Sequence, residues 1–318
     1  MLENFWYPIL EAKQLRKKPQ TLLRLNRSWT LWRDADNEPV AFPSFCPHRG
    51  ANLGQGRVCD GHLECPWHGF RFAADGTCSK TPCQGPDAKV PQNLHIQPAT
   101  LRSAHGLIWM WYGERRADYP DIPFFDDVTL EASRSSETSY VLPHHYTRMV
   151  EANLDMHHTP FVHKWSVPGL GAIVRDFHAR LEGNRIYTTG QLCRAEQSEG
   201  MAFRADVILP NLGMIELTDK LHLLVASTPM DDGHTWLWFR YYQNYSNLPG
   251  VRRAISWLAV QSELRIVQKQ DWRIFSGFAP GTIDDVDYHM VQADLGIALY
   301  RKRRRELLDS TTRAAAHG

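Results

Sequence analysis

The chain has 318 residues, of which 43% are hydrophobic and 22% charged, with a formal net charge of +1. This length and balance suit one large or two modest globular domains, and such a charge creates no field that would attract nucleic acid or a membrane surface. The N-terminus lacks a signal-peptide pattern, and the longest obvious apolar run, Leu107–Tyr112, is far shorter than the ~20 residues of a membrane-spanning helix. Six cysteines without a secretory context predict reduced thiols or metal ligands. We therefore expect a cytoplasmic protein that binds neither nucleic acid nor membranes.

Residues 1–116 are predicted to form a small all-β domain. Short segments rich in β-branched and aromatic residues alternate there with clusters of Asp, Asn, Gly and Pro, a pattern typical of an antiparallel sandwich or barrel. The Pro- and Asp-rich stretch Ala117–Pro123 then has the composition of a connector. The segments expected as strands are Thr21–Leu25, Trp29–Trp32, Val40–Phe45, Phe70–Phe72 and Gly106–Tyr112.

Residues 117–318 are predicted to form a second, α+β domain. A helix is expected over Tyr146–His158, and alternating segments between Phe177 and Tyr245 predict successive strands of one antiparallel sheet. Two later helices are expected over Val251–Phe275 and Val286–Leu308. The order predicts a sheet with its helices gathered on one side.

Two short motifs in the first domain concentrate metal-binding side chains. Cys46 and His48 belong to the segment CPHRG, and Cys65 and His68 belong to CPWHGF. Both segments lie between predicted strands, so both can form hairpin-like loops that lie side by side. Two thiolates and two imidazoles permit either a tetrahedral zinc ion or a [2Fe–2S] cluster with two Cys on one iron and two His on the other.

A second concentration of ligand chemistry lies between Glu151 and His163. Asp155 and His158 are three residues apart and are expected on one face of a helix. His158 and His163 are five apart, which does not suit an unbroken helix, but Pro160 offers a break that would return His163 to the same point. Two imidazoles and one carboxylate form the facial triad of non-haem Fe(II) oxygenases. A purely structural histidine-rich helix end is the alternative.

The motifs CPHRG and CPWHGF closely resemble the paired motifs of Rieske proteins, and the Arg after the first His resembles the oxygenase and ferredoxin branch. The segment from Asp155 to His163 resembles the Asp-x-x-His-x-x-x-x-His signature of Rieske oxygenases. This resemblance covers nearly the whole chain. It implies a Rieske [2Fe–2S] domain over residues 1–116 and a helix-grip catalytic domain over residues 117–318.

The resemblance also implies roles for individual residues. His158 and His163 would bind a mononuclear Fe(II), and Asp155 would link the two centres by hydrogen bonds to His158 and to His68 of the partner subunit. The third iron ligand is expected on a late helix, where we prefer Asp271 to Asp285 because Asp271 lies well inside a long predicted helix. A solvent-exposed Asp271 without a metal is the alternative reading. The expected cluster ligands are Cys46, His48, Cys65 and His68.

The activity implied by the resemblance is an oxidation with O2 as co-substrate. Electrons from NAD(P)H would arrive through a separate reductase, with or without a ferredoxin, because the chain has no flavin or nicotinamide fingerprint. A homotrimer is implied, since the productive cluster and iron would belong to different subunits. The length of the chain is similar to that of proteins in the demethylase and monooxygenase branch. This similarity favours hydroxylation or oxidative demethylation of an aromatic or heterocyclic small molecule. The alternatives are an aromatic-ring cis-dihydroxylating dioxygenase and a Rieske electron carrier whose second domain only binds a partner. Apolar side chains that could line a pocket or simply belong to the core are Phe203, Leu209, Leu212, Met214, Leu223 and Trp238.

Overall fold

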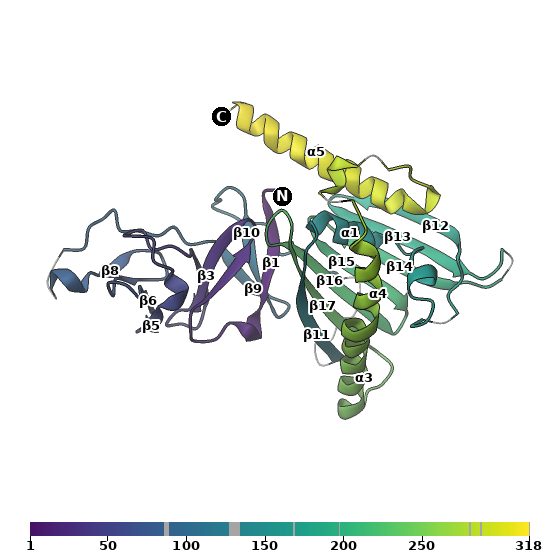
Figure 1. Cartoon of the computed structure of the whole chain (residues 1–318), viewed down its shortest axis with the longest axis horizontal. Coiled ribbons are helices and arrows are strands. Elements are labelled where there is room, and N and C mark those ends of the chain that lie inside the picture. Colours follow the sequence, from purple (N-terminus) through teal and green to yellow (C-terminus); the bar gives the residue numbers. More distant parts are fainter. Residues whose placement is uncertain are drawn as a thin grey trace. The chain divides into compact units, whose positions relative to one another are not determined.

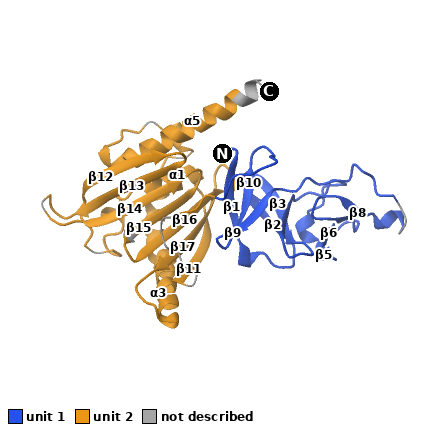
Figure 2. Ribbon diagram, turned by 180° about the vertical axis from the view of Figure 1, so that it is seen from behind, with its two compact units in different colours: residues 1, 3–122 blue, residues 2, 123–318 orange. Residues whose placement is uncertain are grey.

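The chain folds into two compact units (Figure 2). One contains residues 1 and 3–122, and the other contains residues 2 and 123–318. We predicted the division after residue 116, at the start of the connector, and the units divide near its end. The computed structural model describes residues 1–85, 89–126, 134–167, 169–196, 198–279, 281–286 and 288–317, without the side chains of residues 217 and 314–317.

The first unit consists of three antiparallel sheets, in agreement with the predicted all-β domain. Their strand orders are β1-β10-β9, β2-β3-β4 and β5-β6-β7-β8. The buried aromatic side chains of Trp32, Phe42 and Phe72 form a core that also includes Cys46 and Cys65. The strands are β1 Phe5–Glu11, β2 Gln20–Arg24, β3 Arg27–Arg33, β4 Pro39–Pro43, β5 Arg57–Cys59, β6 His62–Glu64, β7 Arg71–Phe72, β8 Cys78–Lys80, β9 Leu101–Ala104 and β10 Leu107–Tyr112.

The second unit is built on a seven-stranded antiparallel sheet (Figure 1). Strands β12 to β17 follow one another as neighbours, whereas β11 pairs with β17 at the far edge. The chain between β11 and β12 must therefore cross the whole sheet. The strands are β11 Ser135–Leu142, β12 Ile173–Glu182, β13 Arg185–Cys193, β14 Met201–Ile208, β15 Leu212–Thr218, β16 Leu221–Pro229 and β17 Thr235–Gln243.

The helices of the second unit lie over one face of this sheet, which confirms the predicted α+β class (Figure 1). Helix α1 packs against β14, β15 and β16, α3 against β11 and β17, and α5 against β12 and β13. None of the helices described is long and apolar enough to cross a membrane. The helices are α1 Tyr146–Leu154, α2 Thr159–Val162, α3 Pro249–Ser262, the π-helical turn η5 Glu263–Val267, α4 Gln268–Phe275 and α5 Leu295–His317.

Three predicted helix boundaries were wrong, one of them the end of α5, which lies at His317 rather than Leu308. Helix α1 ends at Leu154 rather than His158, because the backbone of Asp155 leaves the helical region with φ −88° and ψ 89°. The last helix begins at Leu295 rather than Val286. The Asp294 carboxylate accepts a hydrogen bond from the backbone N–H of Val291 at 2.9 Å, which caps the start of the helical segment.

Candidate metal centres

Two loops of the first unit share one backbone arrangement. Gly50 donates its N–H to the carbonyl of Cys46 at 2.9 Å, and Gly69 donates to the carbonyl of Cys65 at 3.1 Å. The two glycines have φ angles of 74° and 70°, in the left-handed region that glycine adopts without steric cost. Each cysteine therefore begins a tight turn of the same shape.

The two loops place the predicted ligands as two pairs. Nδ1 of His48 lies 3.2 Å from Nδ1 of His68 at the outer end of the loops. Cys46 and Cys65 are both buried, and their thiols interact. Burial and the adjacent Cys65 thiol raise the pKa of Cys46 to about 11, against hydrogen bonds from the loop backbone that lower it. The structure thus separates a sulfur end from a nitrogen end.

This separation distinguishes between the zinc ion and the [2Fe–2S] cluster that the motifs allow. A tetrahedral zinc ion with bonds of about 2.0–2.3 Å would hold all four donor atoms within about 4 Å of one another. Throughout the described part of the chain, one group of three such donor atoms lies within 4.8 Å, and it belongs to the second unit. The thiol pair and the imidazole pair are therefore too far apart for one ion. They fit a cluster with two irons, each bound by one pair.

The second group consists of His158, His163 and Asp271. His158 precedes α2, His163 follows it, and Asp271 comes from α4 more than a hundred residues later. Oδ1 of Asp271 lies 3.1 Å from Nε2 of His163 and 3.9 Å from Nε2 of His158. One donor atom from each residue lies within 4.8 Å of the other two. Two imidazoles and a carboxylate thus converge on one point, which a single metal ion can occupy.

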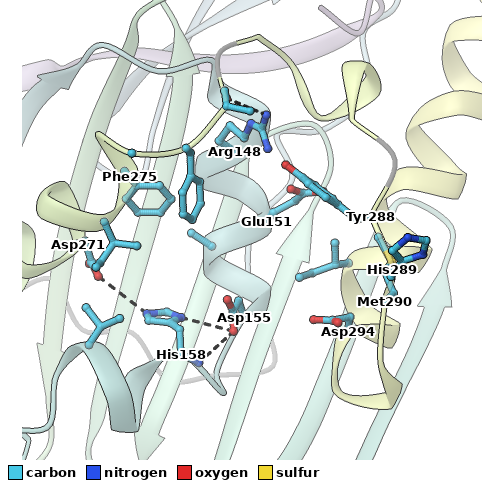
Figure 3. A pocket seen from close by; sticks show the side chains of 17 residues that line it. Arg148, Glu151, Asp155, His158, Asp271, Phe275, Tyr288, His289, Met290 and Asp294 are labelled. Atoms are coloured by element: carbon cyan, nitrogen blue, oxygen red, sulfur yellow. Dashed lines mark hydrogen bonds and ion pairs between the residues drawn. The ribbon is translucent and has the colours of Figure 1, made fainter.

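The other ring nitrogen of each histidine also has a partner. Nδ1 of His158 lies 3.5 Å from Oδ1 of Asp155, and that oxygen accepts the backbone N–H of His158 at 3.1 Å. The His158 ring lies between the carboxylates of Asp155 and Asp271 (Figure 3). Nδ1 of His163 lies 2.9 Å from Oε1 of Gln270. Partners of this kind orient metal-binding imidazoles and make them more basic.

The electrostatics of the group favour a cation. Burial alone lowers the pKa of His158, but the hydrogen bond and charge of Asp155, with the charge of Asp271, raise it above its ordinary value. The pKa of His163 is also raised, because the interactions with Asp271 and Gln270 outweigh the lowering of this pKa by burial. Both rings therefore lie in a negative field, in which a bound cation is stabilised.

Two details differ from the local geometry that we predicted, and a third concerns the carboxylate that we did not prefer. Asp155 follows α1 in a non-helical conformation, so it contacts His158 through a turn and not along a helix face. Pro160 lies at the start of α2, where it initiates a helical turn rather than breaking one. The alternative ligand Asp285 does not join the histidines. Its carboxylate caps a short helix by accepting the backbone N–H and the hydroxyl of Thr282, at 2.7 and 2.9 Å.

Two cavities reach this group. A cavity of about 270 Å³ contacts His158, His163 and Asp271 and has mostly apolar walls from the sheet and the helices above it. A second cavity, of about 570 Å³, includes His158, Asp271 and Asp155 and extends to Tyr288 (Figure 3). Leu223 alone among the six candidate pocket residues lines the smaller cavity, and the other five are buried in the core: Phe203, Leu209, Leu212, Met214 and Trp238.

Several residues of the site were missed in the sequence. Gln270 could have been found from the sequence, since it directly precedes Asp271. His157 is partly buried and bridges two carboxylates. Its Nδ1 lies 3.2 Å from Oδ1 of Asp155 and its Nε2 lies 3.5 Å from Oδ1 of Asp294. No spacing rule connects His157 with Asp294, because their proximity depends on how α5 packs.

Residues 5–98 match the Rieske [2Fe–2S] domain family. The chain is 29% identical over 160 residues to protein TIC 55, chloroplastic, of Pisum sativum, covering 50% of this chain and 29% of that protein. It is 25% identical over 258 residues to the oxygenase subunit of 3-chlorobenzoate-3,4-dioxygenase of Comamonas testosteroni, covering 75% and 58%. It is 31% identical over 164 residues to the oxygenase component of dicamba O-demethylase of Stenotrophomonas maltophilia, covering 51% and 48%. The chain thus spans between 29% and 58% of the length of these relatives.

The fold also matches solved structures. The structure of dicamba monooxygenase bound to dicamba superposes with a TM-score of 0.75 at 17% identity, covering 98% of this chain and 99% of that one. NdmB of Pseudomonas putida CBB5 gives a TM-score of 0.79 at 19% identity, covering 97% and 92%. Fold and site together define a Rieske domain joined to an α+β domain with a two-histidine, one-carboxylate group. In sequence and fold, the chain is similar to Rieske non-haem iron oxygenases.

Proposed function

We propose that this chain is the oxygenase component of a Rieske non-haem iron oxygenase and oxidises an aromatic or heterocyclic small molecule with O2. The observation that carries the proposal is the convergence of His158, His163 and Asp271 beside an apolar cavity. Non-haem Fe(II) oxygenases use this donor set, which leaves coordination positions for O2 and substrate. The cavity supplies the concave, mostly apolar surface that small-molecule sites share.

The side chains have distinct roles in this proposal. Cys46 and Cys65 bind one iron of the cluster, and His48 and His68 bind the other. His158, His163 and Asp271 bind the mononuclear Fe(II), while Asp155 and Gln270 hold the two imidazoles so that Nε2 of each faces Asp271. When both groups are bound, the cluster supplies electrons one at a time and the mononuclear iron activates O2.

Hydroxylation or oxidative demethylation is the reaction type that we favour. The dicamba O-demethylase relative and the fold shared with dicamba monooxygenase support this choice. The 3-chlorobenzoate-3,4-dioxygenase relative supports dihydroxylation of an aromatic ring as the second candidate. The two differ in product, because a dihydroxylated ring gains two oxygen atoms and two hydrogen atoms.

The proposal also includes partners. A reductase, with or without a ferredoxin, passes electrons from NAD(P)H to the cluster. We infer a homotrimer in which Asp155 links His158 to His68 of the partner subunit, so that electrons cross between subunits. Such a protein would act in the cytoplasm, where soluble reductases are available.

A substrate screen tests the proposed activity. Protein with its cluster reduced by dithionite is exposed to O2 with a panel of aromatic and heterocyclic compounds, and the products are identified by mass. Gain of one oxygen indicates hydroxylation, and loss of one methylene unit indicates demethylation. His158→Ala is the control, because it should abolish products while the visible absorption of the cluster remains. An active His158→Ala variant would remove His158 from the proposed iron site, whereas a protein with a full cluster, no mononuclear iron and no products would favour the electron carrier.

A further inference from the structure

The smaller cavity contains one acidic side chain that the proposed iron site does not use. Glu263 lines this cavity together with His158, His163 and Asp271 and is only 4% exposed. Its carboxylate accepts a hydrogen bond from the hydroxyl of Tyr241 at 2.7 Å. Tyr241 comes from β17 in the sheet and Glu263 from the helical layer above it, so the pair connects opposite walls of the cavity.

The backbone brings Glu263 to the same cavity as Asp271 through the π-helical turn η5. Eight residues of regular α-helix would separate the two side chains by about 80° around the axis. A π turn contains more residues per turn, which reduces this angle, and such turns occur frequently at functional sites. Glu263 and Asp271 therefore face one cavity from positions about two turns apart along the helix.

A buried carboxyl group normally requires a cation or several hydrogen bonds to offset the loss of hydration. In the part of the chain that the structure describes, Glu263 has a hydrogen bond from Tyr241 but no ion-pair partner. Burial raises its pKa to about 7, with the Tyr241 hydrogen bond opposing this rise. A carboxyl group with one protein donor retains lone pairs for a donor on a ligand.

The remaining described residues around the cavity include hydrogen-bond donors such as the Asn153 amide, but no cationic side chain that would pair with an anion. None of them is a lysine or an arginine. Of the two positive charges that Fe(II) would bring, Asp271 offsets one, and ionised Glu263 offsets the other. A carboxylate on the substrate would therefore lie beside Glu263 without a countercharge, which is unfavourable in a buried apolar site.

Building on the proposed function, we propose that the substrate is a compact, largely apolar molecule without negative charge whose amine or hydroxyl group donates a hydrogen bond to Glu263. Its opposite end faces His158, His163 and Asp271. Tyr241 positions the Glu263 carboxylate for this contact. Glu263 is thus a specificity-determining residue at the end of the substrate away from the oxidised carbon.

Calorimetric binding of four one-ring probes to the iron-loaded protein tests this assignment. Benzylamine and benzyl alcohol carry a donor, toluene lacks one, and benzoate is an anion of similar size. We expect benzylamine and benzyl alcohol to bind at least about 10-fold more tightly than toluene and benzoate, as one hydrogen bond to a buried acid allows. Glu263→Gln should weaken benzylamine about 10-fold or more and leave toluene unchanged. Tyr242→Phe is the control, because Tyr242 follows Tyr241 but does not line the cavity. This variant should change the affinity for neither benzylamine nor toluene.

Benzoate binding as tightly as benzylamine in the unmodified protein would overturn the inference without any variant, as would the failure of all four probes to bind. Unchanged benzylamine affinity in folded Glu263→Gln would overturn it as well. These outcomes are separable from failure of the proposed function. Protein that selects the donor probes and carries full iron, but oxidises nothing, would refute the oxygenase activity alone. Protein that oxidises compounds without this selectivity would refute the inference alone.

Discussion

Nδ1 of His163 lies 2.9 Å from Oε1 of Gln270, the residue that directly precedes Asp271 on α4. One helical turn therefore supplies both a carboxylate for the metal and an acceptor that orients a histidine ligand. Gln270 also accepts a hydrogen bond from the hydroxyl of Ser166 at 2.9 Å, which fixes the amide in place. In the proposed site, binding of iron would thus depend on a side chain that does not contact the metal.

Gln270→Leu should weaken binding of the mononuclear iron by about 10- to 100-fold, the usual effect of removing an outer partner of a metal-bound histidine. Gln270→Glu retains the acceptor and should keep most of the affinity. Iron retained during dialysis against a graded series of chelator concentrations measures the difference. Equal retention in the Leu and Glu variants would show that the contact with His163 is dispensable.

The choice between the two candidate carboxylates can be tested directly. Asp271→Ala should lose the mononuclear iron and keep the absorption of the cluster, because Asp271 lies 3.1 Å from Nε2 of His163. Asp285→Ala is the matched control and should keep its iron, since Asp285 caps a turn at Thr282. Iron analysis with absorption spectra separates the two. Loss of iron in the Asp285 variant alone would reverse the assignment.

Asp155→Asn should leave both metal centres bound and slow oxidation by about 10-fold or more, since the amide is neutral and changes the hydrogen bonds to His158. The rate at which O2 and substrate reoxidise the reduced cluster in a single turnover measures the effect. Iron content and the cluster spectrum are measured on the same samples. An unchanged reoxidation rate would remove Asp155 from the path between subunits.

Stability should fall as the pH drops below 6.5, because His145 is buried in the neutral form. Its ring accepts the backbone N–H of Thr147 at the start of α1. Burial, with the nearby charge of Arg304, lowers its pKa from 6.5 to about 4. As the pH falls, the unfolded chain binds this proton before the folded chain does. The contribution of neutral His145 to the free energy of unfolding is therefore complete above pH 6.5 and is lost as the pH falls to about 4, which lowers that free energy by about 3 kcal/mol.

His145→Asn, which retains an acceptor at the cap, should remove most of this dependence. Free energies of unfolding of the two proteins at several pH values measure it. Parallel pH profiles would contradict the role given to His145.

The features of this molecule that depend on local sequence patterns could be predicted from the sequence. The loops of Cys46 and Cys65 were evident because their spacing and glycines define the turns without help from distant residues. The fold class was correct, since the change from alternating segments to a helical period is marked near Pro249. The short strand β1 Phe5–Glu11 was missed because almost all its residues are buried, which removes the alternation that marks a half-exposed strand.

Features that depend on tertiary packing could not be predicted from the sequence. Asp271 could be preferred to Asp285 only by its helical context, because neither spacing nor composition shows which carboxylate approaches His158 and His163. The end of α1 was placed too late, since its residues suit a helix up to His158 and only the contact of Asp155 with His158 shows why the chain turns earlier. The approach of Glu263 to the cavity depends on a π-helical turn, which has no clear sequence signal.

Iron stoichiometry tests the central claim most directly. We expect about three iron atoms per chain, two in the cluster and one mononuclear, in protein reconstituted with iron and sulfide. The variant with both His158→Ala and His163→Ala should hold about two, with the cluster spectrum unchanged. About two iron atoms in the unmodified protein, with no further loss in this double variant, would contradict the account.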